Sequence, residues 1–129
     1  MAKHNVLVLG VGKIGSLITC LLSQSGDYHV HLGNLNLEAA ESLVSQLGLK
    51  NVTISQIDAQ NSGDLDNLFG QQQFDAVISS LPYYCNPLVA DLAAKYQVNY
   101  FDLTEDVSVT EHVKQISQNQ KTVFMPQCG

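Results

Sequence analysis

Three glycines near the start of the chain have a spacing that suits the binding of phosphate groups. They lie in the segment Gly10-Val-Gly12-Lys-Ile-Gly15, which directly follows the apolar run His4–Leu9. In a strand-to-helix turn the first glycine permits a tight bend, the second lets the backbone approach a diphosphate, and the third lets the helix pack closely on the strand. The N–H groups at the start of the helix then face the phosphates and stabilise their charge. We therefore predict a dinucleotide site at this turn, with an ordinary glycine turn as the alternative.

The residues expected near the adenosine ribose leave the choice between NAD and NADP open. NAD sites usually carry an acid about 20 residues after the glycine turn, whereas an arginine nearby accommodates the extra phosphate of NADP. Asn34 stands near that position, and its amide can hydrogen-bond a ribose hydroxyl without repelling a 2′-phosphate. The chain has no arginine. Lys13 is either a partial substitute for it or a solvated lysine near the diphosphate.

Three further groups of residues follow predicted strands. Asp58 ends the third strand, where it either accepts a hydrogen bond from adenine or caps the next turn. The segment Ser79-Ser-Leu-Pro82 ends the fourth strand, where backbone and small side chains would face the nicotinamide half of a dinucleotide. Tyr83 and Tyr84 come next, and we expect their rings to pack beneath the loop, with a wall of the nicotinamide site as the alternative.

Strands and helices are predicted to alternate along the whole chain. Apolar runs and helical spacing predict strands at residues 4–9, 29–32, 52–57, 76–79, 98–103 and 122–125, with helices at 14–24, 37–47, 62–69, from 86 onward and at 108–118. In the first helix the expected buried stripe is Ile14, Leu17, Ile18, Leu21 and Leu22. In the fourth helix Asn86 is the expected N-cap, with Pro87 at the first helical position. The alternation predicts a single α/β domain, a Rossmann-type doubly wound parallel sheet of six strands in the order 3-2-1-4-5-6.

Composition narrows the classes of partner. The chain has 129 residues, 45% of them hydrophobic, and a formal net charge of −6, which makes nucleic acid an unsuitable partner. No apolar stretch is long enough for a membrane span, and no signal peptide precedes the first strand. Cys20, Cys85 and Cys128 are too widely spaced to suggest a disulfide framework, so we expect reduced thiols, Cys20 as a core residue, and a cytoplasmic location. The histidines show no metal-ligand spacing, and no metal is expected.

Five segments of the chain are shared with one known family. They are Val6–Gly15, Ile57–Ala59, Ser80–Tyr84, Tyr100–Asp106 and Met125–Gly129. Together they resemble the N-terminal nucleotide-binding domain of the saccharopine dehydrogenase family over nearly the whole chain. The run Tyr100-Phe-Asp-Leu-Thr-Glu-Asp106 is the most specific, because general dinucleotide-binding domains have no reason to carry it. The resemblance implies an NAD(P)-dependent oxidoreductase acting on a carbon–nitrogen bond, in which a hydride passes between the nicotinamide and an imine carbon.

The resemblance also implies which residues contact the cofactor. The diphosphate would be contacted by Gly10, Gly12, Lys13, Ile14 and Gly15, the adenosine ribose by Asn34, the adenine by Asp58 and Ala59, and the nicotinamide ribose by Ser80, Leu81 and Pro82. Family members often carry an acid, or serine followed by arginine, where Asn34-Leu35 stands here. That departure leaves the preference between NAD and NADP unassigned.

Family enzymes continue into a second domain that supplies the substrate pocket and most acid/base residues. The resemblance therefore implies that residues 1–129 are the NAD(P)-binding domain of a longer two-domain enzyme with an amine or imine substrate, and that this domain alone is inactive. Catalytic residues stay unassigned: Asp102, Thr104 and Glu105 either border the substrate pocket or cap the next helix. A homodimer is one option for the full enzyme. The rival hypothesis is a non-enzymatic module that senses NAD(H), and a methyltransferase fits the glycine spacing less well.

Overall fold

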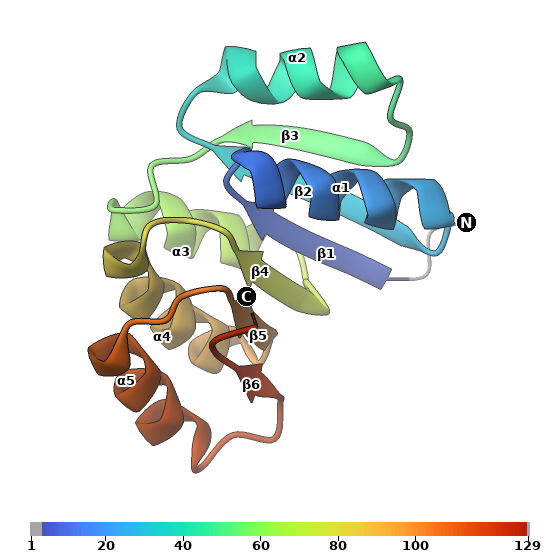
Figure 1. Ribbon diagram of the computed structural model, residues 1–129. Coiled ribbons are helices and arrows are strands. Elements are labelled where there is room, and N and C mark those ends of the chain that lie inside the picture. The colour runs from blue at the N-terminus through green and yellow to red at the C-terminus, as the bar shows by residue number, and fades with distance from the viewer. Residues whose placement is uncertain (1–3, 129) are drawn as a thin grey trace.

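Six short strands and five α-helices alternate along residues 4–128, the part of the chain that the computed structural model describes (Figure 1). The strands are β1 His4–Leu9, β2 Tyr28–Asn34, β3 Val52–Gln56, β4 Ala76–Ser79, β5 Asn99–Asp102 and β6 Phe124–Met125. The helices are α1 Lys13–Ser25, α2 Leu37–Leu47, α3 Ser62–Gln71, α4 Asn86–Tyr96 and α5 Val107–Ser117, and the 3-10 turn η1 Tyr83–Cys85 precedes α4. Gly129, the last residue of the shared segment Met125–Gly129, lies outside the described residues.

All six strands form one parallel sheet in the order β3-β2-β1-β4-β5-β6, which confirms the predicted doubly wound topology. The central strand β1 pairs with β2 on one side and with β4 on the other, so that Leu9 lies opposite both Gly33 and Ser79. The strand order reverses at this point. Ligands of open α/β sheets bind at such a reversal, outside the carboxyl ends of the strands.

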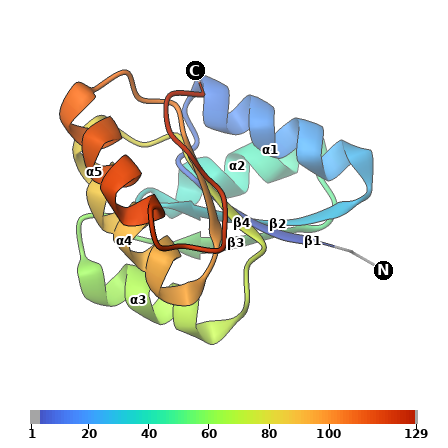
Figure 2. The same ribbon diagram turned by 90° about the horizontal axis from the view of Figure 1, so that it is seen from below.

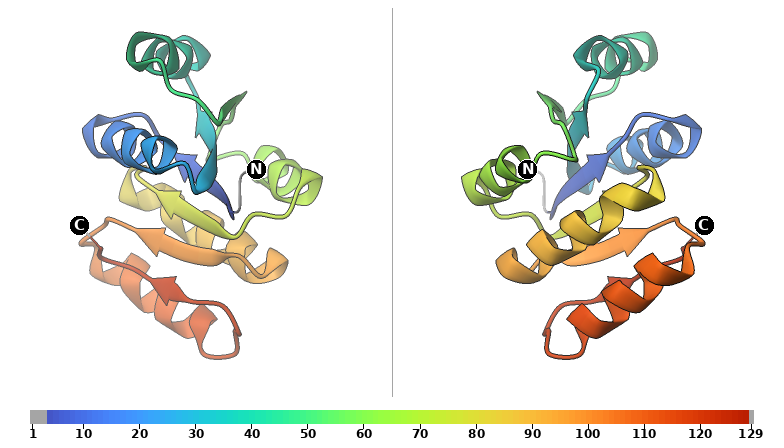
Figure 3. Two further views of the ribbon diagram at one scale, coloured as in Figure 1. Left: turned by 90° about the vertical axis from the view of Figure 1, so that its right-hand side faces the viewer. Right: turned by 90° about the vertical axis from the view of Figure 1, so that its left-hand side faces the viewer.

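Helices cover both faces of the sheet, as the two side views in Figure 3 show. One core joins α1 and α2 to β1 and β2, with Val8, Val30 and Leu32 fully buried. The larger core joins α3, α4 and α5 to the opposite face, where Leu7, Val77 and Tyr100 are fully buried. Seen from below in Figure 2, the α1 and α2 layer and the α3 layer lie on opposite sides of the strands. The two cores hold the carboxyl ends of β1, β2 and β4 in fixed register.

The buried face of α1 differs from the predicted apolar stripe. Its most buried residues are Gly15, Thr19 and Ser23, spaced four apart. The small side chains of these residues allow the helix to approach the sheet closely, and the Ser23 hydroxyl donates a hydrogen bond to the Lys50 carbonyl at 2.5 Å. Of the predicted stripe, Ile18 and Leu22 are half-buried against the core. The exposed members are Ile14, Leu17 and Leu21, each with more than half of its surface exposed.

The start of α4 also differs from the prediction. Asn86 is the first residue of the helix and not its N-cap, because η1 runs directly into α4 and places Cys85 at the cap. The Asn86 side chain is buried, and its Oδ1 accepts a hydrogen bond from the Ser79 hydroxyl at 2.6 Å. The predicted cap residue instead ties the end of β4 to α4.

The cysteines of the described part of the chain are all free thiols. Cys20 is half-buried on α1, so its predicted place in the core is only partly correct, whereas Cys85 is buried and Cys128 is exposed. Within residues 4–128 no helix has the length and apolar character needed to cross a bilayer.

Candidate functional site

Two of the three predicted glycines are required by the fold at the carboxyl edge of the sheet. Gly10 has a φ of +100°, and a Cβ there would lie 2.7 Å from the Ser80 hydroxyl oxygen. A Cβ on Gly15 would overlap the Gly10 carbonyl oxygen and the Ser80 hydroxyl. The turn is held in place by a 2.9 Å hydrogen bond from the Gly10 amide to the Gly33 carbonyl. Gly10 and Gly15 therefore let α1 start close against the ends of β1 and β4.

Gly12 has a different role, because it faces open space. A Cβ there would meet no atom within 4 Å. Gly12 is the N-cap of α1, and no side chain within residues 4–128 caps this helix. By contrast, α2, α3 and α5 are capped by the side chains of Asn36, Asn61 and Asp106. The amides at the start of α1 are thus available to an external anion. We call the turn Gly10–Gly15 with these amides the cradle, and it fits a diphosphate.

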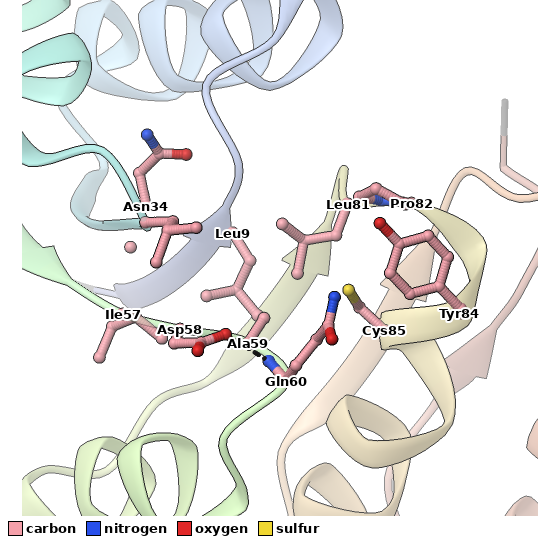
Figure 4. Close-up of a pocket in the computed structure, with 12 residues that line it drawn as sticks. Leu9, Asn34, Ile57, Asp58, Ala59, Gln60, Leu81, Pro82, Tyr84 and Cys85 are labelled. Atoms are coloured by element: carbon pink, nitrogen blue, oxygen red, sulfur yellow. Dashed lines mark hydrogen bonds between the residues drawn. The ribbon is translucent and has the colours of Figure 1, made fainter.

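Two adjoining pockets lie at the carboxyl edge, and the start of α1 lines the second of them. The first, which we call the β3-side pocket, has a volume of about 200 Å³ and is shown in Figure 4. Its lining consists of Leu9, Gly33, Asn34, Leu35, Ile57, Asp58, Ala59, Gln60, Leu81, Pro82, Tyr84 and Cys85. The second, the β5-side pocket, has a volume of about 400 Å³ and is lined by Gly12, Lys13, Ile14, Gly15, Ser80, Leu81, Tyr83, Leu103 and Thr104. Every predicted contact residue except Gly10 lines one of the two, and Leu81 lines both.

In the β3-side pocket the two polar candidates are held by local hydrogen bonds. The Asn34 amide nitrogen donates to the Asn36 carbonyl at 2.8 Å. The Asp58 carboxylate accepts from the Gln60 amide at 3.0 Å and so caps the turn that follows β3. The capping role predicted for Asp58 is therefore confirmed, and its second carboxylate oxygen leaves the adenine contact as a prediction.

In the β5-side pocket the residues with polar side chains are Lys13, Ser80, Tyr83 and Thr104. The Ser80 hydroxyl donates to the Leu9 carbonyl at 2.9 Å and is used to join the ends of β4 and β1. Lys13 lines this pocket and not the β3-side pocket. That position does not support Lys13 as a substitute for arginine next to the Asn34 ribose.

The run Tyr100–Asp106 has a structural explanation at its centre. Asp102 is fully buried and accepts hydrogen bonds from the Tyr100 hydroxyl at 2.6 Å, the Thr104 amide at 3.1 Å and the Gln127 amide at 3.0 Å. Burial raises the pKa of the Tyr100 hydroxyl, and the hydrogen bond to Asp102 adds to the shift, so Tyr100 stays a donor. Asp106, and not Asp102 or Glu105, caps α5. The run therefore fixes the loop that carries Leu103 and Thr104 into the β5-side pocket.

Comparison with known proteins identifies the family. The family described as the saccharopine dehydrogenase NADP binding domain matches residues 6–124. The chain belongs to this family. No curated protein matches the chain. The chain is accordingly an NAD(P)-binding domain of dehydrogenases, with NAD or NADP as its cofactor.

Solved structures of dehydrogenases have the same fold. Apo saccharopine dehydrogenase (L-Glu forming) from Saccharomyces cerevisiae is 22% identical with a TM-score of 0.82, and the match covers 98% of this chain and 27% of that one. The myo-inositol dehydrogenase from Lactobacillus casei, solved with NAD(H) and myo-inositol, is 18% identical with a TM-score of 0.75, covering 98% and 36%. The myo-inositol 2-dehydrogenase from Lactobacillus plantarum is 16% identical with a TM-score of 0.73, covering 96% and 36%. The chain therefore spans about a third or less of the length of these neighbours.

Sequence reasoning missed several residues that line the site of this family member. Gln60 and Cys85 line the β3-side pocket, and Leu103 lines the other. Burial raises the pKa of the Cys85 thiol, with the Asp58 carboxylate adding to the shift, so a neutral thiol forms that wall. Tyr83 and Tyr84 are exposed and meet edge to face at 5.7 Å, so the prediction that they pack beneath the loop is wrong. Only the position of the tyrosines after β4 signalled a place in the site.

Proposed function

We propose that this chain is the cofactor-binding part of an NAD(P)-dependent oxidoreductase that acts on the carbon–nitrogen bond of an amine or imine substrate. The observation that carries the proposal is the family match over residues 6–124. It is supported by the uncapped start of α1, which lines the β5-side pocket, and by the second pocket that adjoins it at Leu81, an arrangement that suits a molecule with a diphosphate at its middle and a ring system at each end.

In the proposed arrangement the amides of Lys13 and Ile14 at the start of α1 bind the diphosphate, with Gly10, Gly12 and Gly15 shaping the turn. The adenosine half enters the β3-side pocket, where Asn34 contacts the ribose and Asp58 and Ala59 contact the adenine. The nicotinamide half enters the β5-side pocket beside Ser80 and Leu81, and Pro82, the third predicted nicotinamide contact, follows them in the same loop but lines the β3-side pocket. When bound, the cofactor supplies or accepts the hydride, and the residues of this chain hold and orient it.

The acid/base groups of the reaction are proposed to come from another part of a longer polypeptide. Among residues 4–128, the lining of the β5-side pocket includes Lys13 and Tyr83 but no histidine and no carboxylate. The solved neighbours are about three times as long as the matched region. On the face of the sheet that carries α1, apolar side chains stay exposed on Leu17, Leu21 and Met125. We propose that a second domain packs on this face, and a homodimer contact is the alternative. We also propose that the enzyme is cytoplasmic, with reduced thiols.

Calorimetric titration of the chain with NADH tests cofactor binding. The expected dissociation constant is micromolar or weaker, because the second domain is absent from the titrated chain. Gly12→Val should abolish binding by placing a side chain where the diphosphate lies, yet leave the fold intact because the space around Gly12 is open. Equal affinity of the wild type and a folded Gly12→Val variant would remove the proposed site.

The substrate class is tested with the longer polypeptide and the absorbance of the reduced nicotinamide. Secondary amines formed from amino acids should be oxidised, and polyols such as myo-inositol should not. Oxidation of polyols alone would overturn the carbon–nitrogen assignment. Binding of NADH with turnover of neither class would favour the sensing module.

A further inference from the structure

The rim of the β3-side pocket determines whether a 2′-phosphate on the adenosine ribose is tolerated. In this fold the residues that follow β2 lie against that ribose, where an acid selects its free hydroxyl and an arginine accommodates a phosphate. Here Asn34 ends β2, Leu35 and Asn36 form the connection, and α2 starts at Leu37. Figure 4 shows Asn34 and Asp58 on the same side of the pocket, facing Leu81 and Pro82 across it.

Positive charge is lacking at this rim. No lysine within residues 4–128 lines the pocket, and the chain has no arginine. The described lysines lie elsewhere: Lys13 in the β5-side pocket, Lys50 in a separate hollow beside Ser23, Lys95 in an ion pair with Asp66, Lys114 on α5 and Lys121 ahead of β6. A 2′-phosphate would therefore bring about two negative charges to a rim without a cation.

Negative charge is present at the same place. Asp58 lines the pocket, and Glu38 lies in the first turn of α2, directly after the connection. Each carboxylate would repel a phosphate but not a hydroxyl.

The remaining polar groups of the rim also favour a hydroxyl. The start of α2 is an anion site in principle, but the Asn36 side chain caps it by accepting from the Ala39 amide at 3.1 Å. The Asn36 carbonyl can only accept, so the Asn34 amide nitrogen must face it. That hydrogen bond leaves the Asn34 side-chain oxygen, an acceptor, as the group that a ribose can reach. An acceptor pairs with a ribose hydroxyl and repels a phosphate oxygen.

We propose that this chain selects NAD(H) over NADP(H), although its family is described as binding NADP, and that the rim formed by Asn34, Leu35 and Asp58 sets the selectivity. The inference rests on the dinucleotide site of the proposed function and deepens it. At low salt NADPH should bind at least tenfold more weakly than NADH, and the ratio should shrink as salt screens the carboxylates.

The test is a pair of titrations, NADH and NADPH, followed by the fluorescence anisotropy of the reduced nicotinamide. Leu35→Arg places a cation at the rim, where the Leu35 side chain is 64% exposed. This variant should bind NADPH at least tenfold more tightly than the wild type does and change NADH affinity less than threefold. The matched control is Leu47→Arg, which adds the same charge at an exposed position on the last turn of α2. It should leave the ratio of the two affinities unchanged.

The outcomes separate this inference from the site itself. Equal or tighter binding of NADPH by the wild type overturns the selectivity but leaves the dinucleotide site standing. An equal response to Leu35→Arg and Leu47→Arg overturns the role of the rim, because it would show a general charge effect. Binding of neither nucleotide overturns the proposed function and this inference together.

Discussion

Substitution of Gly15 by alanine should destabilise the fold more than the same substitution at Gly12. A Cβ on Gly15 would overlap the Gly10 carbonyl oxygen and lie 3.0 Å from the Gly10 carbonyl carbon, so backbone at the base of the turn must move. Overpacking of this kind costs up to about 3 kcal/mol. Alanine in a helix interior recovers about 1 kcal/mol relative to glycine. The net loss is therefore up to about 2 kcal/mol, which lowers Tm by at most roughly 8 °C in a domain of this size.

The Gly12→Ala variant supplies the matched control. Its Cβ meets no atom within 4 Å, and its φ of −66° suits any residue, so the cost should be about 1 kcal/mol or less from the poorer N-cap. Urea unfolding followed by circular dichroism measures both variants. In a Ser80→Ala background the cost of Gly15→Ala should persist, because the Gly10 carbonyl remains in the way. Wild-type stability of Gly15→Ala, or an equal loss in both glycine variants, would refute this assignment of roles.

Three further predictions concern the surroundings of the site. Asp102→Ala should lower the free energy of unfolding by about 3 to 5 kcal/mol, because the Tyr100 hydroxyl and two backbone amides lose their acceptor, and Tyr100→Phe should lower it by about 1.5 to 2 kcal/mol. A loss below about 1 kcal/mol for Asp102→Ala in urea unfolding would contradict the buried network. Burial, with His29 adding to the effect, lowers the pKa of His31 below 6.5, so the unfolded chain binds a proton more readily and the free energy of unfolding should fall as the pH drops from 6.5 to the folded pKa. If His31→Gln leaves this pH dependence of stability unchanged, His31 is not its cause. Tyr83→Ala should change the free energy of unfolding by less than about 0.5 kcal/mol, because the ring is exposed, but should weaken NADH binding roughly threefold to tenfold. Unaltered NADH affinity would show that the ring is not part of the nicotinamide site.

The fold could be predicted from the sequence because local patterns and topology agree. Short β-branched runs alternate with helical spacing, and parallel strands joined by right-handed crossovers leave few other arrangements. The predicted strand ends differ by one or two residues, as at β5, where Val98 and Leu103 lie outside the strand. The stripe on α1 was wrong because spacing identifies an apolar face but not which part of it the sheet covers. The sheet packs against the part of α1 that carries the small residues Gly15 and Thr19.

The candidate site could be predicted only where backbone geometry determines it. The spacing of Gly10, Gly12 and Gly15 predicted a turn that the structure forms, because Gly10 and Gly15 meet steric demands of a strand-to-helix turn, while Gly12 leaves the space in front of the helix open. Side chains that enter a pocket from the far side of a loop, such as Cys85, carry no comparable signal. Cys85 reaches the pocket because η1 runs into α4 without a break. The sequence instead predicted that α4 is capped by Asn86, so this continuity was not foreseen.

Binding of the dinucleotide by the amides at the start of α1 can be observed residue by residue. The measurement follows backbone amide resonances of the isotopically labelled chain during titration with NADH. The largest shifts are predicted at Gly12, Lys13 and Ile14, with smaller ones in the β3-side and β5-side pockets on either side. Saturation with unmoved resonances at these three amides, and the main shifts elsewhere, would contradict the account.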